Sequence, residues 1–324
     1  MKFFIITGSM RTGTTLLSEL FEKMPPSNLS LSKIALMGDK SGVVRNLLRS
    51  KIGDLSDLSG LKRLIVEEVA RHVDITDCDI IGAKQTELFE NEIDNLKVLF
   101  DDVLVIVTLR DPRDVYCSNY KRRFNKVGIP SSFCMLFPLL HYFINVRKKS
   151  QIVVRYEDLV EYPQKTLQSV LEKLNLSAKT QNFEFINSVS SNSSYCETVG
   201  VGSISDFGVV NTSVGAYKNQ LSVNDSLLIQ ALFEEVMLEN GYQCKPLELN
   251  KRKDYLIQWA KFSCMCELDT FHKENLVKVM NSVFDQFEID DIFSQFDNVE
   301  KDIVENLRKQ NTALRKRNEI LLNK

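Results

Sequence analysis

The sequence predicts an α/β fold, in which a parallel sheet lies between two layers of helices. Short apolar runs rich in β-branched residues alternate with longer stretches whose apolar residues recur every three or four positions. The strongest run, residues 103–109, is almost continuously apolar, as in a strand that is buried on both faces. With 324 residues, 44 % of them hydrophobic, the chain is long enough to bury such a core.

The N-terminal part of the chain supplies the first two predicted strands. Residues 3–7 form an apolar run that stops at Gly8, and residues 14–24 follow with helical spacing until Pro25-Pro26. An amphipathic helix is predicted for residues 61–73, and a second strand for residues 79–83.

The rest of the core continues the alternation. After the strand at 103–109, Pro112 stands where the first turn of a helix tolerates proline. The remaining expected elements are a strand at 151–155, a helix at 163–174, a long surface loop at 187–213, a helix at 224–240 and helices beyond about residue 250. We therefore expect an α/β domain over 1–245, a helical extension over 246–296 and a separate tail over 297–324.

The tail has the spacing of a short coiled coil. Leu307, Leu314 and Leu321 repeat every seven residues, with Asn311 and Asn318 on the companion position. Leucine at one core position and asparagine at the other favour a parallel two-stranded coiled coil. We expect a homodimer through residues 297–324, although a single helix packed on its own protein fits the same pattern.

Composition limits the partners and the compartment. The net charge of −2 gives no reason to expect nucleic acid as a partner. Seven cysteines, an odd and scattered set, suit free thiols, and the spacing of Cys264 and Cys266 does not favour a metal site. No apolar run reaches the roughly 18 residues of a membrane span, and residues 3–6 are too short for a signal sequence. We expect a cytoplasmic protein with no metal.

The loop after the first strand has the frame of an anion-binding turn. Residues 8–15 read Gly-Ser-Met-Arg-Thr-Gly-Thr-Thr, which places two glycines five positions apart between a strand and a helix. Such a loop directs backbone N–H groups and a helix N-terminus at one anion. Thr14 stands where a nucleotide triphosphatase has lysine, and the cation is Arg11 instead. A metal-free anion site fits best, with a kinase-like site or a plain tight turn as alternatives.

A second basic motif follows the strongest strand. Arg110 comes at the carboxyl end of that strand, and Ser118 lies about two turns into the next helix. Ligands of doubly wound sheets bind at the carboxyl ends of strands. An arginine and a hydroxyl group at that edge can bind a phosphate through charge-assisted hydrogen bonds.

Taken in order, these motifs resemble the sulfotransferase family that uses 3′-phosphoadenylyl sulfate, over roughly residues 3–245 and with a P-loop-like topology. Residues 11–17 are similar to its 5′-phosphosulfate loop, 110–114 with Ser118 to its 3′-phosphate motif, 154–167 to its next strand-helix segment, and 215–219 to the segment that closes over the nucleotide. The resemblance implies that the donor is bound by Arg11, Thr12, Gly13, Thr14, Thr15, Arg110, Ser118 and Lys218. Arg113, which we interpret as an exposed charge, and Arg155 and Glu157, which we interpret as structural, are not assigned to the site.

The catalytic groups are less clearly marked. Lys84 resembles the family's lysine at the end of the second strand, and Glu87 is the nearest carboxylate that can serve as general base. The alternative is that Glu87 merely begins the helix that follows. The three histidines, at 72, 141 and 272, fall in helical stretches and fit packed or surface positions better.

The resemblance implies transfer of a sulfuryl group from 3′-phosphoadenylyl sulfate to a hydroxyl, with Arg11, Lys84 and Glu87 catalytic and 3′,5′-bisphosphoadenosine as product. The acceptor is not readable, and a glycan or a small metabolite is preferred. A P-loop kinase and a non-catalytic nucleotide-binding scaffold, dimerised by the coiled coil, are the competing hypotheses.

Overall fold

The computed structural model describes residues 2–24, 34–37, 43–50, 58–76, 78–123, 133, 135–176, 184–188, 213–265 and 270–296. The chain divides into two compact units. The first contains residues 1–119 and 141–220, and the second contains residues 120–140 and 221–324. The predicted division at residues 245 and 296 stays a prediction, and the predicted coiled coil at 297–324 lies outside the described residues.

The first unit is built on a five-stranded sheet in which every strand pair is parallel. The strands are β1 (Lys2–Gly8), β2 (Ile34–Met37), β3 (Ile80–Lys84), β4 (Val103–Leu109) and β5 (Ile152–Arg155), in the order β2-β3-β1-β4-β5. β1 is central, with β3 on one side and β4 on the other. The carboxyl ends of β1 and β4 are in register, with Gly8 opposite Thr108.

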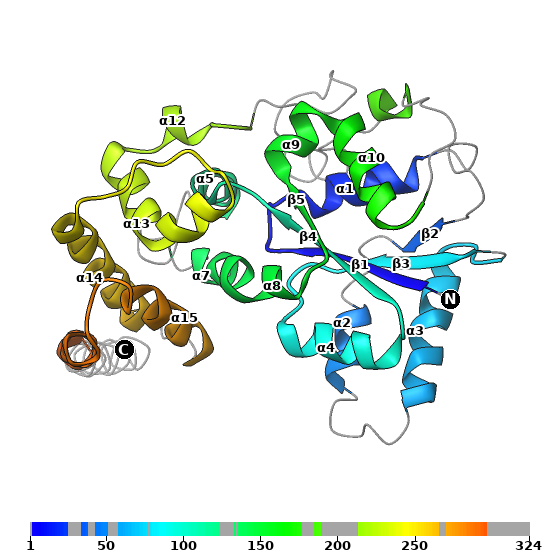
Figure 1. Cartoon of the computed structure of the whole chain (residues 1–324), viewed down its shortest axis with the longest axis horizontal. Helices are drawn as coiled ribbons and strands as arrows, with labels where there is room; N and C mark the ends of the chain where they lie inside the picture. The colour runs from blue at the N-terminus through cyan, green and yellow to red at the C-terminus, as the bar shows by residue number, and fades with distance from the viewer. Residues whose placement is uncertain are drawn as a thin grey trace, which may run out of the picture. The chain divides into compact units, whose positions relative to one another are not determined.

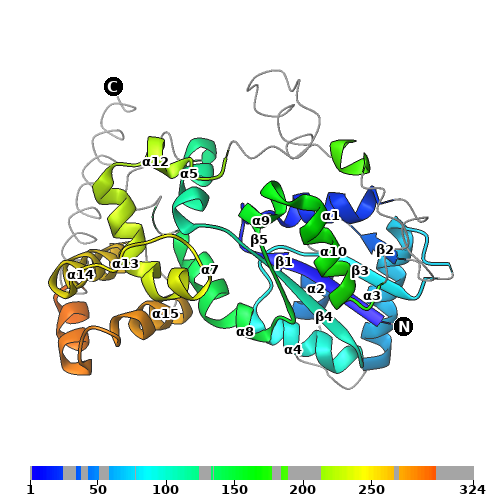
Figure 2. The same cartoon turned by 45° about the horizontal axis from the view of Figure 1, so that its top comes forward.

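Helices cover both faces of this sheet, as Figures 1 and 2 show. One face carries α1 (Thr14–Glu22), α9 (Tyr156–Glu161) and α10 (Pro163–Lys173), and the other carries α3 (Leu58–His72) and α4 (Glu90–Leu99). Successive side chains of β1 point to opposite faces of the sheet and pack against the two helix layers. Phe4 contacts Phe21 of α1, whereas Phe3 stacks on Phe100 just after α4. The fold class predicted from the sequence, an α/β parallel sheet between helices, is confirmed.

Further helices of this unit lie between β2 and β3, between β4 and β5, and after β5. They are α2 (Val43–Ser50), α5 (Pro112–Arg123, of which residues 112–119 belong to this unit), the π-helix η3 (Tyr142–Val146), α8 (Arg147–Lys149), the 3₁₀ turn η4 (Glu184–Ser188) and α12 (Tyr217–Gln220). Strand β2 was not predicted. It has only four residues, among them Ala35 and Met37, which carry little strand preference, and pairing with β3 defines it.

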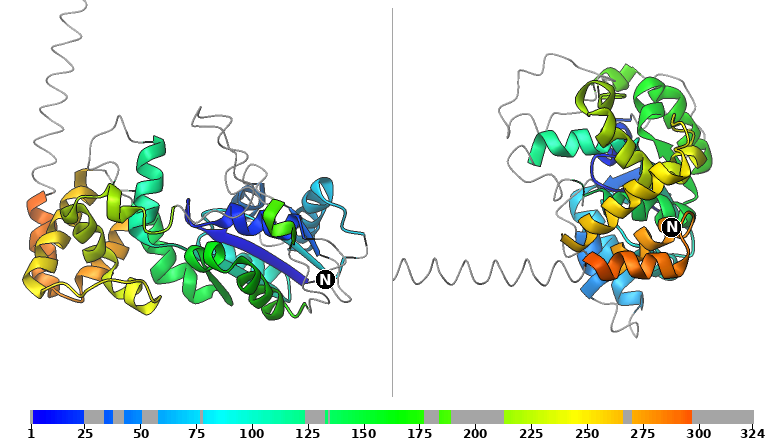
Figure 3. Two further views of the ribbon diagram at one scale, coloured as in Figure 1. Left: turned by 90° about the horizontal axis from the view of Figure 1, so that it is seen from above. Right: turned by 90° about the vertical axis from the view of Figure 1, so that its left-hand side faces the viewer.

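The second unit is helical. It contains α13 (Val223–Glu239), α14 (Leu249–Met265), α15 (Thr270–Met280) and a helical stretch at 286–296, together with part of α7 (Leu136–His141), and Figure 3 shows α13 to α15 from two further sides. Trp259 is its central residue: the ring is fully buried, meets Phe137 edge-on and donates from Nε1 to the Leu228 carbonyl at 2.8 Å. Among the described residues of both units, no helix is long and apolar enough to span a membrane.

Candidate active site

The loop between β1 and α1 has the tight curl that the glycine pattern predicts. Arg11 and Gly13 both have positive φ, of 68° and 100°, and Leu17 N donates to Gly13 O to open α1. A Cβ at Gly13 would lie 2.7 Å from the ring of Tyr156. Position 13 therefore requires glycine for its backbone conformation and for the space beside Tyr156.

The Thr12 side chain is used inside the protein. Its hydroxyl donates to Ser9 O at 2.7 Å and pairs with the Thr108 hydroxyl at 2.8 Å. This hydrogen-bonded pair connects the loop to β4. A side chain at position 8 would disturb it, because a Cβ at Gly8 would lie 2.3 Å from Thr108 Oγ1. A contribution of Thr12 to anion binding would thus come from its backbone N–H.

The start of α1 lies beside the end of β3. Thr14 is buried, whereas Thr15 is exposed and accepts a hydrogen bond of 3.1 Å from Nζ of Lys84. Lys84 is only 6 % exposed, although it carries a cation. The structure thereby brings the predicted lysine to the first turn of α1, next to the loop between β1 and α1.

The two basic motifs meet at the carboxyl edge of the sheet. Arg11 Nε donates to Ser118 Oγ at 2.8 Å, and Arg110 Nη1 donates to the Arg11 carbonyl at 3.3 Å. The motifs are about a hundred residues apart in the chain, and they meet because β1 and β4 are neighbours in the sheet. Arg11, Arg110 and Ser118 thus form one cluster.

The cluster has an excess of positive charge. Burial, followed by the nearby charge of Arg110, lowers the pKa of Arg11, and within the described part of the chain no carboxylate forms an ion pair with Arg11 or Arg110. Arg110 is 4 % exposed, stacks on Tyr156 at 4.2 Å, and its Nε is buried without a hydrogen-bond partner among the described residues. A buried donor and two close cations fit an anionic ligand.

Arg113 is not the exposed charge that the sequence suggested. It is 4 % exposed, because its guanidinium makes a two-bond pair with Asp111, at 2.9 and 2.6 Å, and lies over the ring of Tyr217 at 3.9 Å. Glu157 accepts from Asp111 N at 2.9 Å and so supports the same turn. A sequence motif cannot show this burial, since Tyr217 comes from a distant segment.

Residues 213–220, here called the 213–220 segment, lie against the second motif. Arg110 Nη2 donates to Ser213 O at 2.6 Å, and the Ser213 hydroxyl pairs with Tyr156 OH at 2.8 Å. Asp114 accepts from two backbone N–H groups of the segment. Lys218, the predicted ligand in this segment, is exposed, and its role in the site stays a prediction.

Glu87 lies in a turn before α4 rather than in the helix. Its N–H donates to Gly8 O at 3.1 Å, and its φ is 59°, which is unusual for glutamate. Helix α4 begins three residues later, at Glu90. The structure thus brings Glu87 beside the start of the loop between β1 and α1, and its role as base stays a prediction.

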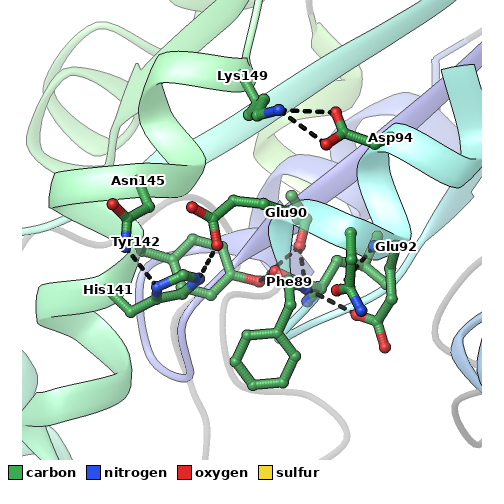
Figure 4. Close-up of polar contacts among 11 residues, drawn as sticks. Phe89, Glu90, Glu92, Asp94, His141, Tyr142, Asn145 and Lys149 are labelled. Carbon is green, nitrogen blue, oxygen red and sulfur yellow. Dashed lines mark hydrogen bonds and ion pairs between the residues drawn. The ribbon is translucent and has the colours of Figure 1, made fainter. Parts of the chain in front are cut away.

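A buried polar network supports this turn (Figure 4). Tyr142 OH donates to Leu88 O at 2.8 Å and pairs with the Thr7 hydroxyl at 3.0 Å. Burial raises the pKa of Tyr142, so the phenol stays protonated and remains a donor. Phe89 N donates to Glu92 Oε2 at 2.7 Å. The turn is therefore tied both to β1 and to α4.

His141 lies at the edge of this network and is a packed residue. The ring is fully buried, and its two nitrogens lie 3.3 Å from Glu90 Oε2 and 2.9 Å from Asn145 Nδ2 (Figure 4). His72 bonds Glu68 on the surface of α3. The interpretation of these two histidines as packed and surface residues agrees with these contacts.

Three supporting residues were missed from the sequence. Asp114 and Tyr156 stand inside the motifs that carry the resemblance, so their position in the sequence was a usable signal, whereas nothing in the sequence marked Tyr142. Among the described residues, no group of three or more His, Cys, Asp or Glu side chains is arranged to hold a metal ion.

Comparisons with known proteins give one family and several structural matches. The model of the sulfotransferase family matches residues 4–180, which is more than half of the chain. The sulfotransferase domain of the olefin synthase of Synechococcus PCC 7002 is 15 % identical with a TM-score of 0.47, covering 76 % of this chain and 96 % of that one. The sulfotransferase domain from the curacin biosynthetic pathway is 15 % identical with a TM-score of 0.46, covering 75 % and 99 %. A mouse sulfotransferase complexed with PAP is 16 % identical with a TM-score of 0.43, covering 73 % and 84 %.

No curated protein matches the sequence. The structural scores lie below 0.5, and the family is shown by the family model, which spans most of β1, all of β2 to β5 and both basic motifs described above. The chain belongs to the sulfotransferase family.

Proposed function

We propose that the chain transfers a sulfuryl group from 3′-phosphoadenylyl sulfate to a hydroxyl group of an acceptor. The observation that best supports this function is the meeting of the two basic motifs: Arg11 bonds Ser118 at 2.8 Å, and Arg110 bonds the backbone of Arg11 at 3.3 Å. A nucleotide with anionic groups at its 5′ and 3′ positions needs two such motifs at one edge of a sheet.

The residues present fit this donor. Two close cations with no carboxylate paired to them in the described chain, one of which has a buried Nε without a partner there, are suited to phosphate and sulfate oxygens. In this proposal the 5′-phosphosulfate is held by Arg11, Thr14, Thr15 and the backbone of Thr12 and Gly13, and the 3′-phosphate by Arg110, Ser118 and Lys218. No metal is required.

The proposed mechanism follows from the groups around the loop. The bound donor supplies the sulfuryl group. Glu87 accepts the proton of the acceptor's hydroxyl group. At the same time the hydroxyl oxygen of the acceptor forms a bond to sulfur, and the bond between sulfur and the 5′-phosphate oxygen breaks. Arg11 and Lys84 stabilise the negative charge that develops on that leaving oxygen. 3′,5′-Bisphosphoadenosine (PAP) is then the product.

The acceptor is proposed only as a hydroxyl-bearing molecule, with a glycan or a small metabolite preferred. Cytoplasmic location and homodimerisation through residues 297–324 also stay proposals. The kinase alternative is not favoured, because Thr14 stands at the position of the lysine that such enzymes direct at the β- and γ-phosphates.

Calorimetry tests the nucleotide. PAP should bind in the presence of EDTA, and ATP with magnesium should bind far more weakly. The opposite order would overturn the proposal in favour of a kinase. A screen of acceptors with donor labelled in the sulfuryl group then separates an enzyme from a scaffold, since a scaffold binds PAP but labels no acceptor.

A further inference from the structure

The 213–220 segment has little of its own to keep it in place. Helix α12 has only four residues, none of them buried, and a helix of this length is not stable by itself in water. Within the segment, Lys218 N bonds Gly215 O at 3.1 Å and Asn219 N bonds Ala216 O at 3.2 Å. The position of the segment therefore depends on its contacts with the rest of the first unit.

Asp114 makes the most specific of these contacts. Its Oδ2 accepts from Gly215 N at 2.7 Å, and its Oδ1 accepts from Tyr217 N at 3.0 Å. Tyr217 is the first residue of α12, where backbone N–H groups have no partner within the helix. One carboxylate thereby accepts hydrogen bonds from two backbone N–H groups of the segment and holds the segment at two points.

The position of Asp114 gives this contact a consequence for the anion site. Asp114 is 1 % exposed and belongs to the first turn of α5, four residues after Arg110 and four before Ser118. The other end of the segment is held by Arg110 itself, which donates to Ser213 O at 2.6 Å. Figure 2 shows α12 beside α5. The same turn that carries the 3′-phosphate motif thus also holds the segment that carries Lys218.

We infer that Asp114 is a positioning residue for nucleotide binding: it holds the 213–220 segment beside Arg110, so that Lys218 and Arg110 act on the same phosphate. This inference rests on the proposed function, since it names how one end of the proposed donor site is assembled. Asp114 itself does not touch the nucleotide.

The first experiment measures the contact between Asp114 and the 213–220 segment without any ligand. Hydrogen exchange of peptides that cover residues 213–220 should be slow at the Gly215 and Tyr217 amides in the wild type. Exchange there should rise at least tenfold in Asp114→Asn, in which one acceptor oxygen becomes a donor. Asp101→Asn, the same change at an exposed position, should leave it unchanged. Fast exchange of both amides in the wild type would overturn the inference.

The second experiment measures binding. Asp114→Asn should bind PAP about tenfold more weakly, a change of about 1.4 kcal/mol, and should bind adenosine 5′-monophosphate as the wild type does, because that nucleotide lacks the 3′-phosphate. Lys218→Ala should weaken PAP binding in the wild type and have no further effect in Asp114→Asn. Equal losses for both nucleotides, or additive effects of the two substitutions, would mean that Asp114 does not position Lys218.

A variant in the 213–220 segment tests the same contact without changing α5, in case Asp114→Asn disturbs the folding of that helix. Tyr217→Pro removes the N–H that Asp114 accepts, at a first helical position where proline is tolerated, and Tyr217→Ala keeps that N–H while removing the same ring. Only the proline variant should reproduce the selective loss of PAP affinity. If the wild type binds no PAP, the proposed function fails, and hydrogen exchange still decides whether Asp114 holds the segment.

Discussion

Replacing Arg11 with methionine should preserve stability and abolish tight nucleotide binding. Among the described side chains, the Arg11 guanidinium makes one hydrogen bond, to Ser118 at 2.8 Å, which contributes about 1 kcal/mol net. Against this, burial and the charge of Arg110 lower the pKa of Arg11, so the folded protein disfavours the charged form. Methionine removes both effects, and the free energy of unfolding should change by less than about 1 kcal/mol.

Arg110→Met is the matched contrast, because Arg110 also holds the fold together. Its loss leaves the Arg11 and Ser213 carbonyls without their donor and removes the stacking on Tyr156 at 4.2 Å. Two part-buried acceptors left without a donor and a lost cation–π contact together should lower the free energy of unfolding by about 3 kcal/mol.

Urea denaturation and calorimetry with PAP separate the two roles. Each variant should lose about 100-fold in PAP affinity, since two charge-assisted hydrogen bonds of about 1.5 kcal/mol each disappear. Only Arg110→Met should unfold at clearly lower urea. If Arg11→Met were destabilised as strongly as Arg110→Met, or if it bound PAP like the wild type, Arg11 would be a structural residue and the reasoning would be refuted.

Three further changes test other parts of the site. Gly13→Ala should lower the free energy of unfolding by about 2–4 kcal/mol in urea denaturation. The reason is that φ at this position is 100° and the new Cβ meets the Tyr156 ring. A loss below about 1 kcal/mol would contradict the tight packing beside Tyr156. Glu87→Gln should reduce turnover of labelled donor about 100-fold or more with PAP affinity unchanged, and near-full turnover would remove Glu87 as the base. Burial raises the pKa of Glu157. Between the ordinary glutamate pKa and this raised value, the native state therefore binds more protons than the unfolded state. The free energy of unfolding then falls as pH rises through that window. Glu157→Gln should flatten this decline in denaturation curves from pH 4 to 7, and an unchanged slope would contradict the raised pKa.

Most of the sheet was predictable because its strands are short apolar runs with few competing interpretations. The predicted strand at 103–109 coincides with β4, and the strands at 3–7, 79–83 and 151–155 agree with β1, β3 and β5 to within one residue at each end. Strand β2 is different in kind. Its identity as a strand depends on pairing with β3, which no local pattern of four residues encodes.

Within the candidate site, the sequence predicts the residues that belong to a single motif, but it does not predict the contacts between motifs. Glycine spacing predicted the loop around Arg11, and the end of a buried strand predicted the place of Arg110. What the sequence could not show is the bond between Arg11 and Ser118, which depends on the strand order, or the burial of Arg113 and Asp114, which depends on the 213–220 segment.

The adjacency of β1 and β4 has a consequence for how this enzyme can vary. Adjacent strands are held about 4.8 Å apart by their backbone ladder, whatever side chains they carry. The separation between the points where the two arginine-bearing turns begin is therefore set by the sheet. Substitutions and insertions elsewhere in the chain can therefore change other parts of the protein while the spacing of these two strands stays constant.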